Sequence, residues 1–390
     1  MDRLIETFRK ILGDTHATFH RYMYDRITWD DRLVGIVGPR GVGKTTMMLQ
    51  YIKEHLDVNK TLYVTADDFY FANHRLVELA DSFAKMGGEY LFIDEIHKHT
   101  EWSRELKLIY DYHPELHIVF SGSSVLDITK GTTADLSRRA VVKYMQGLSF
   151  REYLAMFHQM DLPVLTLEDI IHHRVELPRQ FRPLSFFRDY LMCGYYPFAG
   201  VPDYGERLVS IINKTLEVDI PQYAELSASM SRKLKRLLII ISQSVPFKPN
   251  MTTIGQTLGV SRNHVGDYLL YLEEAGLIAQ LRDTTSGIRG LGKVEKVYLD
   301  NANLIYALAD RKSDVGNVRE TFFMNQMRVR QEVVNSRVSD FEIDNLTFEV
   351  GGRKKGNKQI AAVDNGYVVK DDIEYGYANV VPLWAFGLNY

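Results

Sequence analysis

Hydrophobic residues recur with two different spacings along the first 150 positions of the chain. Near the start, Leu4, Ile5, Phe8, Ile11 and Leu12 recur at helical spacing, which predicts an amphipathic helix packed on the body of the protein. Further on, short apolar runs pass directly into polar residues, as buried strands do. These runs occupy 33–37, 61–68, 90–98, 117–124 and 140–147. Because helical stretches separate them, the β-α-β-α order predicts an α/β fold with a parallel sheet that brings ligands to the carboxyl ends of its strands.

The pattern changes after residue 147, and at 390 residues the chain is long enough for several domains. We expect a first domain over 1–147, a mainly helical region over 148–230, and a helix-turn-helix with a β-hairpin over 231–300. Residues 301–390 are expected to form an α/β domain of their own.

Composition narrows the class of protein. With 45% apolar and 12% aromatic residues the chain has ample material for folded cores. Its single cysteine, Cys193, excludes a disulfide framework and a cysteine-rich zinc site, and it favours a reducing, cytoplasmic location. The first residues lack the features of a signal peptide, and the longest apolar run, 237–241, is far too short for a membrane span.

A glycine-rich stretch directly follows the first predicted strand. Its sequence satisfies G-x-x-x-x-G-K-[ST] at every fixed position, with a predicted helix after it. In such a loop the backbone N–H groups surround a phosphate, the lysine reaches the β- and γ-phosphates, and the hydroxyl of the next residue binds Mg²⁺. The predicted nucleotide-binding residues are Gly38, Pro39, Arg40, Gly41, Val42, Gly43, Lys44, Thr45 and Thr46.

A pair of acidic residues ends the run YLFIDE. A carboxylate at a strand tip can hold the Mg²⁺ ion, so Asp94 is the predicted metal partner of Thr45. Glu95 is the predicted general base that polarises the attacking water. An acidic pair exposed to solvent after a strand is the alternative, and the phosphate-binding motif upstream argues against it.

Two further groups are candidates for contact with the γ-phosphate. Ser123 follows the strand HIVFSG and is predicted to sense the phosphate or the water, with a helix N-cap as the alternative. Arg138 and Arg139 precede the next strand and would stabilise charge in the transition state, with a surface salt bridge as the alternative.

These motifs together resemble the AAA-type branch of P-loop ATPases, particularly bacterial proteins with a C-terminal domain of unassigned function related to restriction endonucleases. The resemblance is carried by GPRGVGKTT, LFIDEIHK, FSGSS, DLSRR and LSFREYL, and later by YLDNANL and FEVGGRKKGNKQI. It implies ATP and Mg²⁺ as ligands and a helical lid over 148–230. In ATPases with an Asp-Glu pair, the strand before Ser123 lies between the strands that lead to the glycine-rich loop and to the acidic pair.

Residues 231–300 carry the pattern of a winged helix. A short helix over 252–258, a turn at Gly259 and an N-cap at Ser261 lead into a second helix that runs to Glu274. Arg262, Asn263 and His264 at its start, and Arg289 on the hairpin tip, are the predicted DNA contacts. The region holds ten Lys/Arg against six Asp/Glu, an excess of +4. Packing against the protein's own nucleotide domain is the alternative to DNA contact.

The last domain shows the acidic residues of a restriction-endonuclease-like site. Asp344-Asn345 is predicted as a two-residue hairpin turn, which pairs Ile343 with Leu346 and places Asp340 opposite Glu349. Glu320 on the preceding helix would complete this candidate second metal site. Such nucleases use Glu-x-Lys, whereas glycine stands at position 351. We therefore expect a degenerate domain that does not cut, with Arg353, Lys354, Lys355 or Lys358 as replacements if it does.

The sequence predicts an Mg²⁺-dependent ATPase whose nucleotide state controls the winged-helix and endonuclease-like regions, with DNA, a second copy or another protein as partner. One alternative is a slow nucleotide-gated switch that acts on a protein partner and has no role on DNA. Another is a nuclease regulated by ATP.

Overall fold

The computed structural model describes residues 1–122, 136, 138–174, 177–178, 181–224, 226–243, 246–283, 293–308 and 315–390. The chain divides into two compact parts, an N-terminal unit, Met1–Gly147, and a C-terminal unit, Leu148–Tyr390. Residues 148–390 form one unit, so their further division into three domains stays a prediction. No helix in the described parts of the chain is long and apolar enough to cross a membrane.

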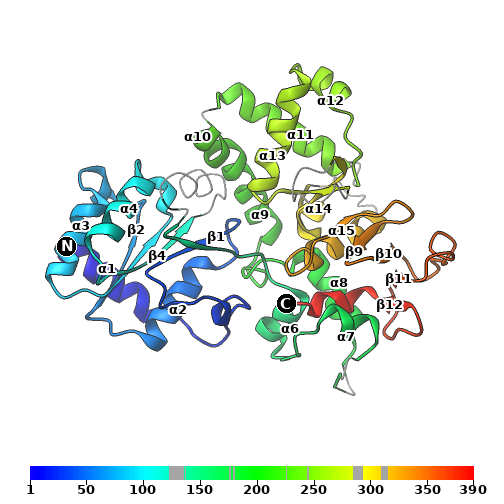
Figure 1. Ribbon diagram of the computed structural model, residues 1–390, viewed down its shortest axis with the longest axis horizontal. Helices are drawn as coiled ribbons and strands as arrows, with labels where there is room; N and C mark the ends of the chain where they lie inside the picture. Colours follow the sequence, from blue (N-terminus) through cyan, green and yellow to red (C-terminus); the bar gives the residue numbers. More distant parts are fainter. Residues whose placement is uncertain are drawn as a thin grey trace. The chain divides into compact units, whose positions relative to one another are not determined.

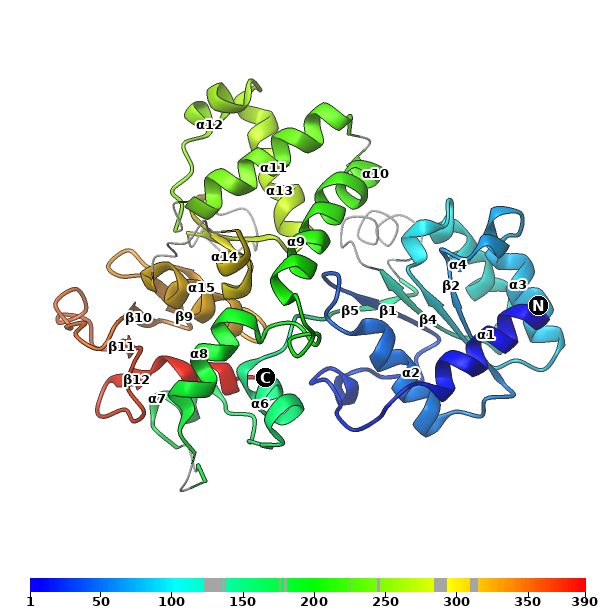
Figure 2. The ribbon, with the colours of Figure 1, turned by 180° about the vertical axis from the view of Figure 1, so that it is seen from behind.

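A five-stranded parallel sheet is the centre of the N-terminal unit (Figure 1). Its strands are β1 (Leu33–Val37), β2 (Thr61–Thr65), β3 (Tyr90–Asp94), β4 (His117–Gly122) and β5 (Val141–Tyr144). They lie in the order β2-β3-β4-β1-β5, and Figure 2 labels β2, β4, β1 and β5 in this succession. The predicted parallel sheet is confirmed, and β4 lies between β1 and β3 as expected. This order matches the core of a P-loop nucleoside triphosphatase.

Helices cover the N-terminal sheet with their apolar sides. They are α1 (Asp2–Gly13), α2 (Lys44–His55), α3 (Leu76–Lys85) and α4 (Trp102–Tyr112), with 3₁₀ turns η1 (Tyr24–Arg26), η2 (Phe69–Ala72) and η3 (Ile96–Lys98). The predicted N-terminal helix is present. It buries Leu4, Phe8 and Leu12, which are spaced four positions apart and therefore lie on the same face of the helix.

The C-terminal unit begins with helices. They are α6 (Phe150–His158), α7 (Leu167–Ile171), α8 (Pro183–Cys193), α9 (Tyr204–Lys214), the π-helical η5 (Thr215–Asp219) and α10 (Ile220–Ala224). Ser149 caps α6 because its hydroxyl accepts the Glu152 N–H while the Glu152 side chain accepts the Ser149 N–H. The helical character expected for residues 148–230 is therefore present in the described part of that range.

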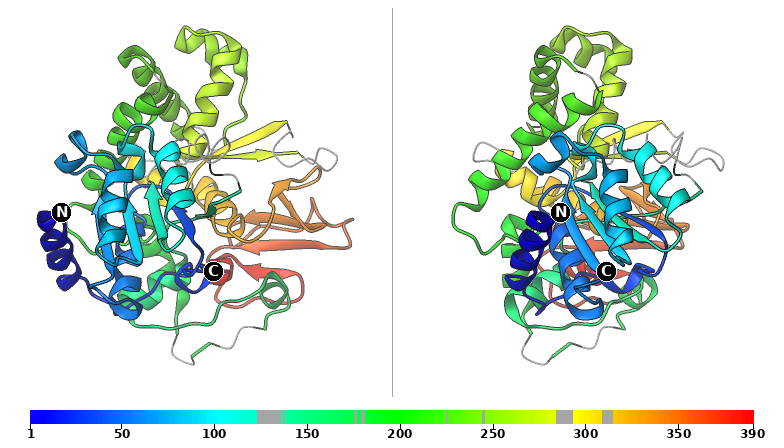
Figure 3. Two further views of the ribbon diagram at one scale, coloured as in Figure 1. Left: turned by 60° about the vertical axis from the view of Figure 1, so that its left-hand side comes forward. Right: turned by 90° about the vertical axis from the view of Figure 1, so that its left-hand side faces the viewer.

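Three helices and a hairpin follow, α11 (Ala228–Gln243), α12 (Met251–Leu258), α13 (Arg262–Glu274), β6 (Ile278–Arg282) and β7 (Val294–Leu299). Gly259, with φ +63°, ends α12, and Ser261 caps α13, as the sequence predicts. The two strands pair antiparallel, and Figure 3 shows them in yellow beside the helices. Contacts of β6 with α13 and of β7 with α11 join the hairpin to these helices.

The chain ends in α14 (Ala302–Leu308), α15 (Val315–Met327) and a second five-stranded sheet that finishes in η6 (Leu383–Leu388). Its strands are β8 (Val334–Asn335), β9 (Phe341–Ile343), β10 (Leu346–Gly351), β11 (Gly366–Lys370) and β12 (Val380–Pro382). The predicted hairpin is confirmed: Ile343 pairs with Leu346, and both Asp344 and Asn345 have positive φ, as a two-residue turn requires.

Candidate functional site

The glycine-rich loop joins the end of β1 to the start of α2. Its backbone needs residues that tolerate positive φ, and Gly38, Gly41 and Gly43 have φ of 150°, 79° and 98°. Gly38 also has no room for a side chain, because a Cβ atom would lie 2.2 Å from the Met145 carbonyl oxygen. The loop ends at Lys44, which is the first residue of α2. The first N–H groups of a helix have no partner within the helix, so this end of α2 can bind an anion.

Lys44 is turned back onto the loop. Its ammonium group donates to the carbonyl oxygens of Gly38, at 2.8 Å, and Pro39, at 2.9 Å, and its side chain is buried. These carbonyls hold the charge of Lys44 within the loop, where phosphate oxygens can take over as acceptors.

Asp94 joins three strands and the helix after the loop. The hydroxyl of Thr45 donates to its Oδ2 at 2.6 Å, and the hydroxyl of Tyr63 donates to the same oxygen at 2.7 Å. Ser121 donates its hydroxyl to Oδ1. Parallel register explains the convergence, because Asp94 lies opposite Thr65 in β2, and its neighbour Ile93 lies opposite Phe120 in β4. The two residues predicted to bind Mg²⁺, Thr45 and Asp94, are thus hydrogen-bonded to each other, and their role as metal ligands stays a prediction.

Tyr63 and Ser121 were not predicted as site residues. Burial and the Asp94 carboxylate raise the pKa of the Tyr63 hydroxyl far above its usual range, so it stays a proton donor. Ser121 is fully buried, and it also accepts the Glu95 N–H at 3.2 Å. Ser123, the serine that the sequence favoured, lies outside the described residues, so its role stays a prediction.

Glu95 has a left-handed backbone, with φ 50°, an unusual conformation for a residue with a side chain. Its N–H donates to Asp94 Oδ1 at 3.1 Å, which fixes the turn at the strand end. Its carboxylate lies 3.5 Å from Arg40 of the glycine-rich loop and 3.5 Å from the buried His97. The predicted base thus faces the nucleotide-binding loop.

Arg21 connects the glycine-rich loop to the end of the N-terminal unit. Its guanidinium donates to the carbonyl oxygens of Val42, of Gln146 at 2.7 Å and of Gly147 at 2.8 Å, and it is 5% exposed. We name this set of contacts the Arg21 clamp. It fixes the last residues before the C-terminal unit to the loop that is predicted to hold the phosphates.

The two arginines ahead of β5 have different surroundings. Arg138 is exposed. Arg139 binds Asp111 through two N–H groups, at 2.9 and 3.1 Å, and this contact supports the salt-bridge alternative for Arg139. A role for either arginine at the γ-phosphate stays a prediction.

The residues of this site fit a nucleoside triphosphate with Mg²⁺. Positive-φ glycines let the backbone N–H groups of the loop turn toward a phosphate, and the buried Lys44 supplies an ammonium group. Thr45 and Asp94 together offer the hard oxygen ligands that Mg²⁺ prefers. When bound, the metal would neutralise charge on the β- and γ-oxygens.

The acidic residues of the C-terminal unit are held by lysines. Lys296 lies 3.8 Å from Glu320 and 3.5 Å from Asp340, while Lys355 lies 2.9 Å from Glu349. Burial and the neighbouring Asp340 carboxylate raise the pKa of Glu320. Among the described residues, no group of three or more His, Cys, Asp or Glu is placed to hold a metal ion. The predicted second metal site at Glu320, Asp340 and Glu349 stays a prediction.

The predicted DNA contacts at the start of α13 are all on the surface. Arg262, Asn263 and His264 are exposed, and the His264 ring is hydrogen-bonded at 2.8 Å to the hydroxyl of the N-cap Ser261. Arg289 lies outside the described residues. DNA contact stays a prediction.

Comparison with known families identifies the class of the first unit. Residues 30–154 match the family described as AAA domain, and the glycine-rich loop, Asp94 and Glu95 all fall within the match. The protein therefore contains an AAA-type ATPase domain on a P-loop nucleotide-binding core. Residues 185–315 match a domain of unknown function (DUF8612). The two matches cover separate parts of the chain.

The chain is also similar to an uncharacterized protein of Methanocaldococcus jannaschii, with 23% identity over 68% of this chain and 60% of the relative. Among solved structures, a Walker-type ATPase of Pyrococcus abyssi shares 12% identity, with a TM-score of 0.46 over 76% of this chain and 99% of that one. AMPPCP-bound DnaA of Aquifex aeolicus shares 12% identity, with a TM-score of 0.28 over 69% of this chain and 86% of that one. Both scores lie below 0.5, so the AAA assignment depends on the family match.

Proposed function

We propose that the N-terminal unit hydrolyses ATP with Mg²⁺ and that its nucleotide state controls the C-terminal unit. The observation that carries the first part is the 2.6 Å hydrogen bond from Thr45 to Asp94. It brings the residue after the phosphate-binding lysine to the strand-tip carboxylate, and these are the two groups that hold Mg²⁺ in P-loop ATPases.

Each residue of the site then has a distinct task. Lys44 binds the β- and γ-phosphates, and the hydroxyl of Thr45 and the Asp94 carboxylate hold the metal ion. Glu95 orients the attacking water and accepts its proton. Arg40 lies 3.5 Å from Glu95, and a γ-phosphate would compete with the Glu95 carboxylate for the Arg40 guanidinium. Binding of ATP would thereby release the Glu95 carboxylate from Arg40.

The Arg21 clamp supports the second part of the proposal. The same guanidinium bonds to Val42 in the phosphate-binding loop and to Gln146 and Gly147, the last residues of the N-terminal unit. A loop that changes conformation around phosphates would shift the Val42 carbonyl. Because the guanidinium is rigid and planar, the shift would be passed to the segment that leads into residue 148.

The test of the chemistry is steady-state ATP hydrolysis by the full chain with Mg²⁺. We expect Lys44→Ala to lose nucleotide binding and turnover, and Glu95→Gln to bind ATP and lose turnover. Exposed Glu101→Gln is the matched control, and it should hydrolyse ATP as the wild type does. Wild-type turnover by Glu95→Gln would rule out Glu95 as the base.

The coupling is tested separately by hydrogen exchange of residues 148–390 with and without a non-hydrolysable ATP analogue. We expect a nucleotide-dependent change that Arg21→Lys reduces, because lysine keeps the charge but cannot bridge three carbonyls. Exposed Arg26→Lys on the same segment is the control. If Arg21→Lys binds the analogue and shows the full wild-type change, the clamp does not transmit the nucleotide state.

The partner is distinguished by repeating the hydrolysis assay with duplex and single-stranded DNA. Stimulation that is lost in Arg262→Ala would support a winged-helix role for α13 on DNA. Turnover that is indifferent to DNA would favour control of a protein partner. The lysines that hold Glu320, Asp340 and Glu349 support a unit that does not cut, so we expect DNA to stay intact in both cases.

A further inference from the structure

Residues 226–266 carry formal charge of one sign only. They include six Lys and Arg residues and no Asp or Glu, whereas the whole chain has a net charge of −3. This stretch contains α11, α12 and the first turn of α13. The three helices contact one another and lie together in the upper part of Figures 1 and 2. The helix-turn-helix is therefore built into a basic segment of an otherwise slightly acidic chain.

The outer face of α11 presents two arginines. The buried residues of this helix are Ser231, Leu234, Leu237, Leu238 and Ile241. Arg232 and Arg236 are exposed, and because they are four positions apart they lie on the same side of the helix. Lys235 differs from them, since it is paired with Glu217 at 3.4 Å. Among the described residues, none forms an ion pair with either arginine.

Lys233 connects this face of α11 to the start of α13. Its ammonium group donates to the Gly259 carbonyl at 3.0 Å, in the turn between α12 and α13. Arg262, three positions after Gly259, is exposed and has no ion-pair partner within the described parts of the chain. We name Arg232, Lys233, Arg236 and Arg262 the basic patch.

The exposed side of α13 changes in character after its first turn. Asp267 and Leu270 are exposed, four and seven positions after the exposed Asn263. A carboxylate in this position repels phosphate, so we expect a nucleic acid to contact α13 only at its first turn. Contact with the phosphate backbone is compatible with this arrangement, whereas readout of base edges along the helix is not.

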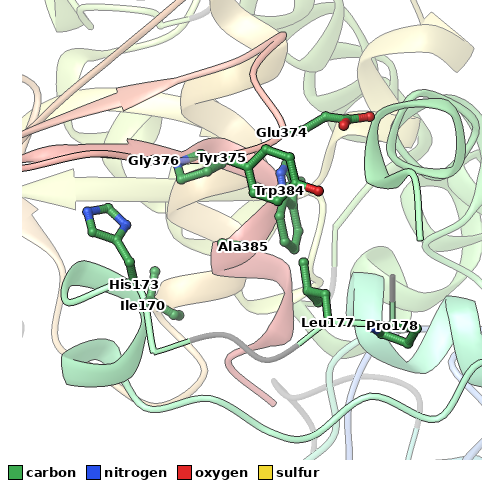
Figure 4. A pocket seen from close by; sticks show the side chains of 10 residues that line it. Ile170, His173, Leu177, Pro178, Glu374, Tyr375, Gly376, Trp384 and Ala385 are labelled. Atoms are coloured by element: carbon green, nitrogen blue, oxygen red, sulfur yellow. The ribbon is translucent and has the colours of Figure 1, made fainter. Parts of the chain in front are cut away.

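A pocket of about 550 Å³ elsewhere in the C-terminal unit, drawn in Figure 4, shows the opposite arrangement of charge. The acidic residue in its lining, Glu374, is paired with Arg182 at 3.3 Å. The charge of Glu374 is thus balanced within the unit. The three arginines of the basic patch have no such partner among the described residues, and they remain available to an external anion.

We propose that the basic patch binds the phosphate backbone of duplex DNA without regard to base sequence. Arg232, Arg236 and Arg262 would pair with phosphates, because a guanidinium group donates two parallel hydrogen bonds to phosphate oxygens. The helix-turn-helix favours a duplex over other polyanions, since such a motif brings the start of its second helix to a groove and its other helix across the backbone.

This proposal names the partner of the proposed function, and it rests on that function only for the coupling of DNA to ATP. Binding to DNA is measured without nucleotide. It can therefore fail while ATP hydrolysis stands, and hydrolysis can fail while binding stands.

The test is binding of the full chain to two fluorescein-labelled duplexes of unrelated sequence and about 20 base pairs, followed by fluorescence anisotropy from about 50 to 200 mM salt. Release of counterions makes log K fall linearly with log[salt], by about 0.9 per phosphate contact. In Arg232→Gln/Arg236→Gln we expect the slope to fall by about two for both duplexes. Each lost contact should weaken Kd about five- to tenfold near 0.1 M salt.

Two controls separate the loss of charge from a change in the fold. Arg232→Lys/Arg236→Lys keeps both charges and should keep the salt slope. Arg188→Gln removes an exposed arginine of α8 outside the basic patch, and it should leave slope and Kd unchanged.

Three results would overturn the proposal. An unchanged slope in the glutamine variant, or no binding of either duplex by the wild type, would remove the basic patch as a DNA site. A strong preference for one duplex would mean readout of bases. Displacement of the DNA by poly-glutamate at equal charge would mean that the patch takes an acidic protein instead.

Discussion

The hydrogen bond from Tyr63 to Asp94 leads to a prediction about stability. Tyr63→Phe removes a 2.7 Å bond to a carboxylate that is 4% exposed, and it leaves the aromatic ring in place. A hydrogen bond to a charged group contributes about 1.5–3 kcal/mol. Because Thr45 still donates to the same oxygen, we expect a loss near the lower end, about 1.5 kcal/mol. For a unit of this size that lowers Tm by about 3–6 °C.

The loss should depend on nucleotide. In the nucleotide-free protein, hydrogen bonds from hydroxyl groups stabilise the Asp94 carboxylate. With Mg²⁺ and an ATP analogue bound, the cation would stabilise this carboxylate instead. The Tm difference between Tyr63→Phe and the wild type should therefore shrink when Mg²⁺ and analogue are present. Thermal unfolding of the full chain, followed by calorimetry with and without both ligands, measures it.

The control is Tyr90→Phe in the neighbouring strand. Tyr90 lies at the start of β3, where its ring stacks on His117 at 4.8 Å, far along the strand from Asp94. This change should alter Tm little, and by the same amount with and without nucleotide. Our reasoning is refuted if Tyr63→Phe behaves like Tyr90→Phe, or if its Tm loss is the same in both conditions.

Three further predictions follow from other contacts. Burial would raise the pKa of Glu105, but Arg75, the Val77 N–H and His99 outweigh burial and lower the pKa. The ionised Glu105 carboxylate therefore stabilises the fold above the ordinary pKa of glutamate, and this stabilisation is lost as pH falls through the lower pKa of the folded state. The unfolding free energies of the wild type and Glu105→Gln should thus converge in acid, as urea titrations at several pH values would show. Arg139→Ala should keep the wild-type kcat, because Asp111 holds this side chain; a kcat loss of a hundredfold or more would instead place it at the γ-phosphate. The full chain with Mn²⁺ should leave plasmid DNA intact on a gel, and cleavage abolished by Glu349→Ala would show that Lys355 does not block that carboxylate.

Local patterns predicted the parts of the fold whose geometry is set within a few residues. The glycine-rich loop, the cap at Ser261 and the turn at Asp344 each depend on the conformational freedom or hydrogen bonding of one or two residues, which the sequence displays directly. The place of β4 between β1 and β3 came from the resemblance to known ATPases. Local patterns could not supply it, because Leu33 in β1 pairs with Ile118 in β4, 85 positions further along the chain.

Contacts between distant segments were beyond the sequence. The contact of Ser121 with Asp94 depends on the register of β4 beside β3, which no local pattern shows. Arg21 meets residues 125 and 126 positions further on, and nothing near it in sequence indicates a role. Lys296 approaches Glu320 and Asp340 from a different hairpin, so the neutralisation of that acidic pair could not be anticipated.

The Arg21 clamp also bears on where the ATPase part of the chain can be cut. The family match begins at residue 30, so an excised domain with those bounds would lack the guanidinium that bonds to Val42. Three carbonyl groups would lose the Arg21 guanidinium as a donor, and Gln50 in α2 would lose its bonds to the carbonyls of His16 and Phe19. A fragment that starts at Met1 keeps these contacts, and the contacts of the folded nucleotide-binding loop therefore extend upstream of residue 30, where the family match begins.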